Sequence, residues 1–313
     1  MSFSYSAVDF IVDELSWPSP RSLSKFDERI ESEFERAMKN GVLRYVQPKG
    51  FNEVKCITTA AGMTMVAEFN PNRGFNKRKR ATAPTMNQPF DPAAFNFTKI
   101  AESEILFKLQ PDINLIGSRG HAPIWAIVNV SPINWCHCLY VIEPDGKCPQ
   151  RLSPEAVRVG FDLMRLSKLP GFRVMFNSMH AWASVNHLHL HSMNLDHELG
   201  MDSCPSIPCG DKGLIRQLCN TKTHLGGYVI NLPIGSVDIE NVVSCVDTII
   251  QFFHRNEIPY NTLWARGTDS GTNKTYANPL YFIDTIFFKF WEQYAFFPAA
   301  SVSIGHFFSI FLS

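Results

Sequence analysis

Apolar residues recur at helical spacing in three parts of the chain. The predicted helices span residues 26–40, 154–168 and 239–256. In the first of them Ile30, Phe34 and Met38 repeat every four positions, which places them on one face of a helix. Ser153 and Asp238 precede the other two helices and are residue types that cap helix N-termini. Each helix is therefore expected to present an apolar face to a core.

Shorter apolar runs, several of them alternating with polar residues, predict β-strands. The predicted strands cover residues 42–46, 54–59, 63–69, 105–109, 124–130, 139–143, 172–176, 185–193, 228–232 and 262–266. Because successive strands are joined with few helical crossovers, we expect an antiparallel sheet with helices packed on it, which is an α+β fold.

The two ends of the sequence differ from its middle. Residues 1–22 are rich in serine and proline, which predicts a flexible N-terminal tail before a main domain over 23–275. Residues 276–313 form an atypical hydrophobic segment, crowded with phenylalanine and isoleucine but interrupted by charged side chains. Two interpretations of this segment stay open: a buried part of the fold, or a non-native or truncated end.

Composition and charge exclude several classes of protein. Lys and Arg together number 29, as do Asp and Glu, so the net charge is zero, and 45% of the residues are hydrophobic. Such a chain is too apolar to be disordered. It is not expected to bind nucleic acid or an anionic membrane by bulk electrostatics. The basic cluster over residues 72–81, which contains Arg73, is accordingly interpreted as a solvated loop.

Cysteine usage points to a reducing compartment. The eight cysteines include no CxxC pair, and the N-terminus has no basic flank before an apolar run, as a signal peptide would. We therefore expect reduced thiols and a cytoplasmic location.

The candidate chemistry lies in an alternating run of histidine and leucine. Side chains two apart in a strand point the same way, at a spacing of about 6.6–6.8 Å, so His187, His189 and His191 would share one face. Three interpretations compete: a polar strand without function, a zinc site, or a nucleophilic imidazole that attacks phosphorus. The zinc site lacks an evident further ligand. The nucleophile is favoured because the preceding loop, residues 178–184, is built of small and polar residues that can cradle an anion.

Four motifs in order identify a family resemblance. The motifs are QPFDPAAFNFTKI at residues 88–100, NVSPI at 129–133, FNS at 176–178 and ASVNHLHLH at 183–191. The HLHLH strand resembles the signature of the histidine-triad superfamily, which includes galactose-1-phosphate-uridylyltransferase-like proteins. The other motifs closely resemble the animal GDP-D-glucose phosphorylases and are less closely similar to the plant GDP-L-galactose phosphorylases. The resemblance covers about residues 42–271, so it makes 23–275 a histidine-triad-like catalytic domain.

The resemblance implies a two-step guanylyl transfer without a dissociable cofactor or a metal. His189 would attack the phosphorus that bears guanosine, forming a covalent GMP–histidine and releasing glucose 1-phosphate. Inorganic phosphate would then attack the intermediate and leave as part of GDP. His191 would donate a proton to the phosphate or to the leaving oxygen, and His187 would brace the nucleophile. The implied partners are thus GDP-D-glucose and inorganic phosphate.

The resemblance also implies substrate-binding residues. Ser184 and Asn177 would bind phosphate oxygens, and Asn129 would hold the ribose hydroxyls, although an asparagine before Ser-Pro is also typical of a turn. His137 would stand in the shell behind the triad, or be a hydrogen-bonded core histidine. One departure is Cys136, where similar proteins generally have glycine.

Two alternatives to phosphorolysis remain at the level of the sequence. A hydrolase of nucleotide sugars or dinucleotides would use water to resolve the same intermediate. A guanine-nucleotide-binding or exchange protein would use the same scaffold with impaired catalysis.

Overall fold

The main element of the fold is a large sheet. A computed structural model describes residues 1–11, 22–58, 64–76, 85–116, 123–197, 199, 202, 204–209, 214–219, 227–231, 239–269, 274–276 and 280–284. The strands of the sheet are β1 (Ser2–Tyr5), β4 (Ile105–Pro111), β5 (Ile124–Val128), β6 (Cys138–Ile142), β7 (Phe172–Asn177), β8 (His189–Asn194), β9 (Ser206–Pro208), β10 (Ile215–Leu218), β11 (Gly227–Ile230), β12 (Tyr260–Trp264) and β15 (Leu280–Asp284).

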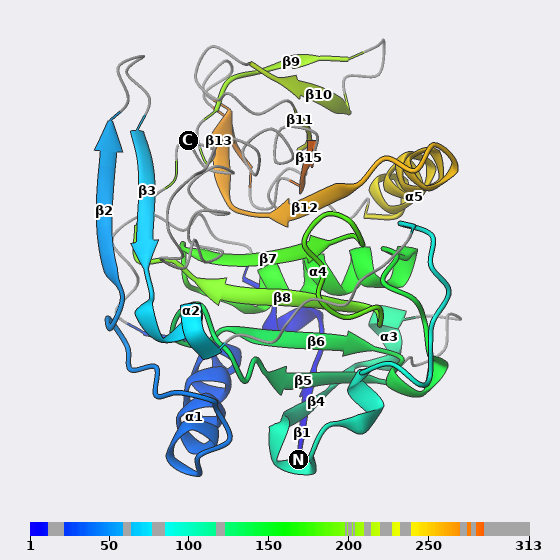
Figure 1. Ribbon diagram of the computed structural model, residues 1–313. Coiled ribbons are helices and arrows are strands. Elements are labelled where there is room, and N and C mark those ends of the chain that lie inside the picture. The colour runs from blue at the N-terminus through cyan, green and yellow to red at the C-terminus, as the bar shows by residue number, and fades with distance from the viewer. Residues whose placement is uncertain are drawn as a thin grey trace.

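The eleven strands follow the order β1-β4-β5-β6-β8-β7-β12-β15-β11-β10-β9 (Figure 1). Every neighbouring pair is antiparallel except β1 with β4. Two ribbons stand outside this sheet: β2 (Glu53–Thr58) pairs with β3 (Thr64–Phe69), and β13 (Gly267–Asp269) pairs with β14 (Lys274–Tyr276). The predicted α+β class with an antiparallel sheet is confirmed.

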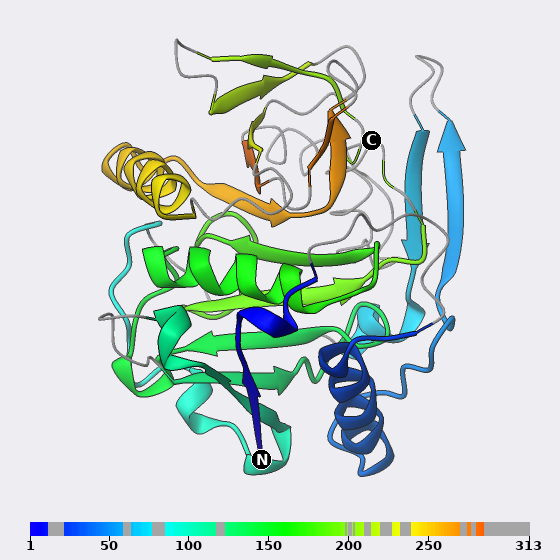
Figure 2. The ribbon, with the colours of Figure 1, turned by 180° about the vertical axis from the view of Figure 1, so that it is seen from behind.

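The helices are α1 (Lys25–Lys39), α2 (Pro71–Asn76), α3 (Ile113–Ile116), α4 (Pro154–Leu166) and α5 (Ile239–Arg255). The long helices α1, α4 and α5 pack on one face of the sheet. Viewed from behind, α4 lies across the sheet and α1 packs below it (Figure 2). Ser24 and Ser153 cap α1 and α4 by accepting hydrogen bonds from backbone N–H groups of the first turn. The cap expected at Asp238 lies outside the described residues.

The two faces of the sheet bury different cores. On the helical face, Trp264 packs on α4, where a Cβ added to Gly160 would approach its ring to 2.6 Å, so only glycine fits there. On the opposite face a smaller apolar cluster forms around Phe97, Leu139 and Val141. This second face carries the histidines, because Leu139 pairs with His191 and Val141 with His189 in the register of β6 and β8.

The prediction of a flexible N-terminal tail is wrong for residues 1–11. β1 pairs in parallel with β4, and Tyr5 is 3% exposed, with its hydroxyl donating to Asp162 Oδ2 of α4 at 2.9 Å. Phe3 also packs against the core. Apolar side chains spaced by serines outweigh the loop-like composition of this segment. Residues 12–21 lie outside the described residues.

Two other sequence-based predictions need correction. Residues 42–46 form no strand; instead Val42 N–H donates to the Ala37 carbonyl and so ends α1, and Arg44 N–H donates to Val130. The strand expected over 185–193 begins only at His189. Within the hydrophobic C-terminal segment, β15 is inserted between β12 and β11, so this part belongs to the sheet, and residues 285–313 lie outside the described residues. No helix of the described ranges has the length and apolarity to cross a bilayer.

Candidate active site

His189 opens strand β8, where it pairs with β6 on one side and is held on the β7 side by a side chain. Its N–H donates to Gln150 Oε1 at 2.9 Å, and its carbonyl accepts from Gln150 Nε2 at 3.2 Å. The same Nε2 donates to the Asn177 carbonyl at the end of β7. The buried carboxamide of Gln150 thus bridges β7 and β8 where they separate, and fixes the backbone of His189. No period or motif marked Gln150 in the sequence.

The tautomer of His189 follows from the hydrogen bond that its ring makes within the described residues. Nδ1 lies 2.7 Å from the His187 carbonyl oxygen, which can only accept a hydrogen bond. Nδ1 therefore carries the proton, and Nε2 keeps a lone pair. Burial lowers the pKa of His189 from the ordinary 6.5 to about 4, although the His187 carbonyl acts in the opposite direction. The ring is thus a neutral imidazole at pH 7, as a nucleophile must be.

His187 contributes to this arrangement through its backbone. The residue lies before β8, so the three histidines do not share one strand face as predicted; only His189 and His191 do, with ring centroids 4.9 Å apart. The His187 imidazole accepts the Phe97 N–H at Nδ1 and stacks on the Phe97 ring. Burial lowers its pKa to about 4. The brace behind His189 is therefore the His187 carbonyl, and the imidazole anchors the segment around Phe97.

His191 is oriented by His137. His137 Nδ1 accepts the Ile133 N–H at 3.0 Å, so the His137 proton is on Nε2. Nε2 lies 3.0 Å from His191 Nδ1 and donates to it. His191 must then carry its own proton on Nε2, the atom that remains for a ligand. Burial lowers the pKa of both imidazoles well below the ordinary value, so both are neutral. A chain of hydrogen bonds, here called the relay, thus runs from the Ile133 N–H through His137 to His191.

The loop before β6 holds His137 in place. Cys136 has a φ of 58°, in the left-handed region that favours glycine, so the glycine implied by the resemblance would fit this position without strain. Asn129 lies against His137, with its Nδ2 3.2 Å from His137 Nε2, and its Oδ1 accepts the Ser131 N–H at 3.0 Å. Asn129 thus makes the predicted turn and also borders the histidines.

Asn177 and Ser184 are placed less directly. Asn177 Nδ2 donates to Asn261 Oδ1 at 2.5 Å, so its amide faces β12. Ser184 is half-buried, and its hydroxyl makes no hydrogen bond within the described residues. The backbone N–H groups of residues 184–187 likewise donate to no acceptor in this part of the chain, which leaves consecutive donors for an anion.

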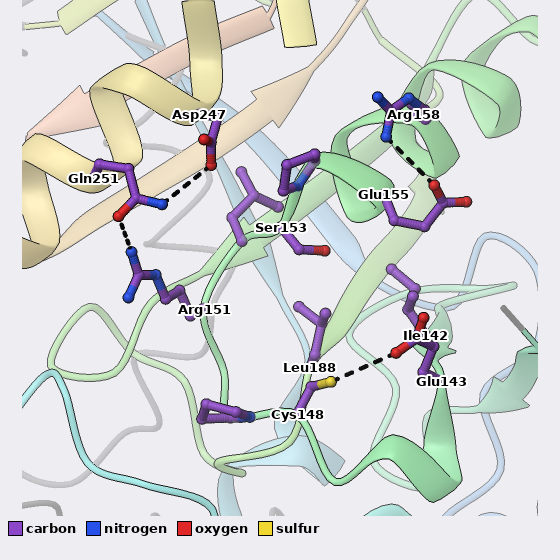
Figure 3. Close-up of a pocket in the computed structure, with 13 residues that line it drawn as sticks. Ile142, Glu143, Cys148, Arg151, Ser153, Glu155, Arg158, Leu188, Asp247 and Gln251 are labelled. Carbon is purple, nitrogen blue, oxygen red and sulfur yellow. Dashed lines mark hydrogen bonds and ion pairs between the residues drawn. The ribbon is translucent and has the colours of Figure 1, made fainter. Parts of the chain in front are cut away.

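A separate cavity lies on the other face of the sheet. Its volume is about 730 Å³, and it opens between the N-terminal end of α4 and helix α5 (Figure 3). Arg151 hydrogen-bonds to Gln251 across it, and Arg158 pairs with Glu155 at 3.5 Å. Leu188 is part of its lining but none of the triad histidines is. This cavity is therefore distinct from the histidine cluster.

The described residues contain no group of three or more His, Cys, Asp and Glu side chains arranged to hold a metal ion. The Nδ1 atoms of the four histidines instead take part in hydrogen bonds, either to the backbone or, between His137 and His191, to another imidazole.

Comparison with known proteins assigns the family. The family model described as GDPGP1-like, N-terminal domain, matches residues 25–193. The chain belongs to this GDPGP1-like family. GDP-D-glucose phosphorylase 1 of Homo sapiens is 34% identical to it over 276 residues, which are 86% of this chain and 70% of the human protein. The resemblance seen in the sequence motifs is thereby confirmed.

More distant relatives agree with this assignment. GDP-L-galactose phosphorylase 2 of Arabidopsis thaliana is 26% identical over 252 residues, which cover 74% of the GDPGP1-like chain and 55% of the plant protein. Among solved structures, yeast Ap4A phosphorylase Apa2 in complex with AMP matches with a TM-score of 0.52 at 18% identity, covering 83% of this chain and 79% of that one. The structural match shows that this chain shares the fold of that phosphorylase.

Proposed function

We propose that this chain catalyses the phosphorolysis of GDP-D-glucose to GDP and glucose 1-phosphate, as the name of its animal relatives states for them. One observation supports the mechanism above all others: His189 is a neutral imidazole whose Nδ1 is committed to a carbonyl, so Nε2 is the nucleophile. A relative's name supports the substrate, and the geometry of His189 supports a covalent route.

In the first step His189 Nε2 attacks the phosphorus that bears guanosine. The new N–P bond forms as the bond to the bridging oxygen breaks, which releases glucose 1-phosphate and leaves GMP on His189. The imidazole becomes cationic in this step, and its Nδ1–H remains bonded to the His187 carbonyl, which stabilises the charge. His191 Nε2–H donates to a phosphate oxygen or to the departing oxygen, where negative charge develops.

In the second step an oxygen of inorganic phosphate attacks the same phosphorus. The N–P bond breaks, GDP leaves, and His189 returns to its neutral form. Binding of both anions is assigned to the free N–H groups after Ser184, to the Ser184 hydroxyl and to Asn177, and binding of the ribose is assigned to Asn129. The free thiols of the described residues accord with a cytosolic location, which is part of this proposal.

A trapped intermediate tests the proposal. The protein is incubated with GDP-D-glucose without phosphate, digested, and the peptide containing His189 is analysed by mass spectrometry. We expect a GMP adduct on that peptide, its discharge to GDP when phosphate is added, and no adduct in His189→Asn, whose turnover should fall by at least ~10⁴-fold.

The products separate this proposal from the alternatives. Release of GMP at the same rate with and without phosphate would mean hydrolysis and would contradict phosphorolysis. Tight GDP binding with no adduct and no turnover would indicate the binding or exchange protein instead, an alternative that no relative named above supports. An unmodified His189 together with full turnover would contradict the covalent route.

A further inference from the structure

Arg73, from the basic cluster of the sequence, is buried beside the candidate active site. The prediction of a solvated loop is wrong for this residue, because Arg73 lies in α2 and is only 7% exposed. Its Nη1 donates to the Ser131 carbonyl, and its Nε has no hydrogen-bond partner among the residues that the structure describes. Tyr45 lies against the guanidinium. An arginine held in this way keeps its full positive charge inside the protein.

Among the residues that the structure describes, no carboxylate pairs with Arg73. Arg173 shows the contrast, since it is also buried but pairs with Asp202 at 2.5 Å. Burial of an unpaired charge is unfavourable, so an arginine placed without a partner needs a reason beyond packing.

Arg73 belongs to a set of donors that holds the loop before His137. Arg73 binds the Ser131 carbonyl and Tyr45 binds the Pro132 carbonyl. Asn70 Nδ2 donates to the Ile133 carbonyl at 2.8 Å, and the N–H of the same Ile133 sets the tautomer of His137. The guanidinium therefore anchors the loop from which the relay starts.

Arg73 acts on three titratable groups: Tyr45, which it contacts, and the two histidines of the relay. The positive charge of Arg73 opposes protonation of both His137 and His191 and lowers their pKa values beyond the effect of burial. Within the described residues, His189 also lowers the pKa values of His137 and His191.

We propose that Arg73 is a positioning residue of this active site: it anchors Ser131 and places a fixed positive charge behind His137 and His191, so that the relay stays neutral while His191 Nε2 presents its proton to the substrate. The need arises from the substrate, because bound phosphate groups attract protons onto neighbouring imidazoles. A doubly protonated His137 could no longer accept the Ile133 N–H. A fixed cation opposes this uptake without entering the reaction.

This inference rests on the proposed function for its purpose, but its test does not need turnover. Long-range proton–nitrogen NMR spectra report the tautomer and protonation of each histidine in the full chain. In the wild-type protein we expect Nε2–H imidazoles at positions 137 and 191 that stay neutral at pH 5.5. Ordinary titration of this pair near pH 6.5 would overturn the proposal even if GDP-D-glucose is turned over.

Variants separate the charge from the hydrogen bond. Arg73→Gln keeps a donor for Ser131 but removes the charge, so both imidazoles should titrate higher by about one pH unit, as expected for loss of a nearby buried charge. Arg73→Lys keeps the charge and should titrate like the wild type. Arg44→Gln is the matched control, because Arg44 is exposed and donates to Asn76 of the same helix.

The kinetic readout has the same logic. Arg73→Gln should lose kcat at pH 6 and recover toward the wild-type value at pH 8, whereas Arg44→Gln should match the wild type at both. A uniform loss at every pH with an unchanged titration would mean a merely structural role and would overturn the proposal. If Arg73→Gln does not fold, Arg73→Met removes the same charge and should show the same shift of both imidazoles toward higher pH; an unchanged titration in Arg73→Met would overturn the proposal.

Discussion

At the scale of single residues, the two histidines of β8 differ in which ring nitrogen carries the proton. His189 and His191 are the same residue type, on the same face of β8, and burial lowers the pKa of each. They differ in what their Nδ1 atoms meet. A carbonyl oxygen opposite His189 leaves its Nε2 as a base, whereas the Nε2–H of His137 opposite His191 leaves its Nε2 as a donor. The neighbouring groups thus leave a lone pair on Nε2 of His189 and a proton on Nε2 of His191, which suits the proposed nucleophile and the proposed proton donor.

Replacing His137 tests the relay at this scale. His137→Phe preserves a buried ring but removes the donor to His191, whose tautomer is then no longer fixed. We expect kcat to fall by about 10- to 100-fold, the usual effect of losing a group that orients a catalytic residue, with a smaller change in KM. Steady-state kinetics on protein shown to be folded by its melting curve provides the measurement.

The control for this variant is His254→Phe. His254 is also buried, but it hydrogen-bonds to Asn87 and Tyr260, away from the triad. Its replacement should lower the melting temperature with kcat per folded molecule unchanged. Equal losses of kcat in both variants would mean that burial of a histidine, and not the relay, is what matters.

At the scale of elements, the site depends on strands that stop pairing at the right place. β7 and β8 separate at Asn177 and His189, and Gln150 replaces the missing strand contact. The loops before β6 and β8 then carry the groups that set the tautomers. The sheet holds the histidines rigidly, and the loops at the ends of its central strands supply the polar groups.

The N-terminal strand gives a second prediction about elements. Tyr5→Phe removes the hydrogen bond from β1 to Asp162 of α4 and should cost about 1–2 kcal/mol of unfolding free energy. For a chain of this size, that corresponds to a melting temperature lower by about 1.5–3 °C, measurable by calorimetry. Val8→Ala is the control, since Val8 is 90% exposed. Equal melting temperatures for the two variants would contradict a docked N-terminus.

At the scale of the whole molecule, the buried histidines make stability depend on pH. Burial lowers the pKa of His187, His189 and His254 from 6.5 to about 4 in the folded protein. Between those two values the unfolded chain binds protons that the folded chain does not, so stability falls as pH falls. Their contribution is complete above about pH 6.5 and is lost progressively down to about pH 4.

Urea denaturation at several pH values measures this dependence. Each imidazole adds at most about 1.4 kcal/mol per pH unit to the slope of the unfolding free energy. His254→Gln isolates one of them: its slope between pH 4 and 6.5 should be smaller than that of the wild type, with the two slopes alike above pH 7. A wild-type stability that stays constant or rises on acidification would contradict this account.

Sequence patterns were enough to predict the long helices, most strands of the sheet and the residues of the triad. Amphipathic periods and capping serines are local signals, and the folded chain obeys them at α1 and α4. The HLHLH run and its flanking motifs also sufficed to identify the family. Local patterns were misleading where long-range contacts dominate, as in β1, which composition alone had marked as a tail.

Which ring nitrogen of each histidine carries the proton depends on tertiary contacts. Residue spacing does not predict the contacts that set these atoms. They are the hydrogen bond of His189 to the His187 carbonyl, that of His137 to the Ile133 N–H, those of His189 to Gln150, and the burial of Arg73. The sequence shows where the histidines are, but the ring nitrogen that carries the proton is set by the hydrogen-bond partner that folding places beside it. Those partners are brought together only when β6, β7 and β8 form one sheet.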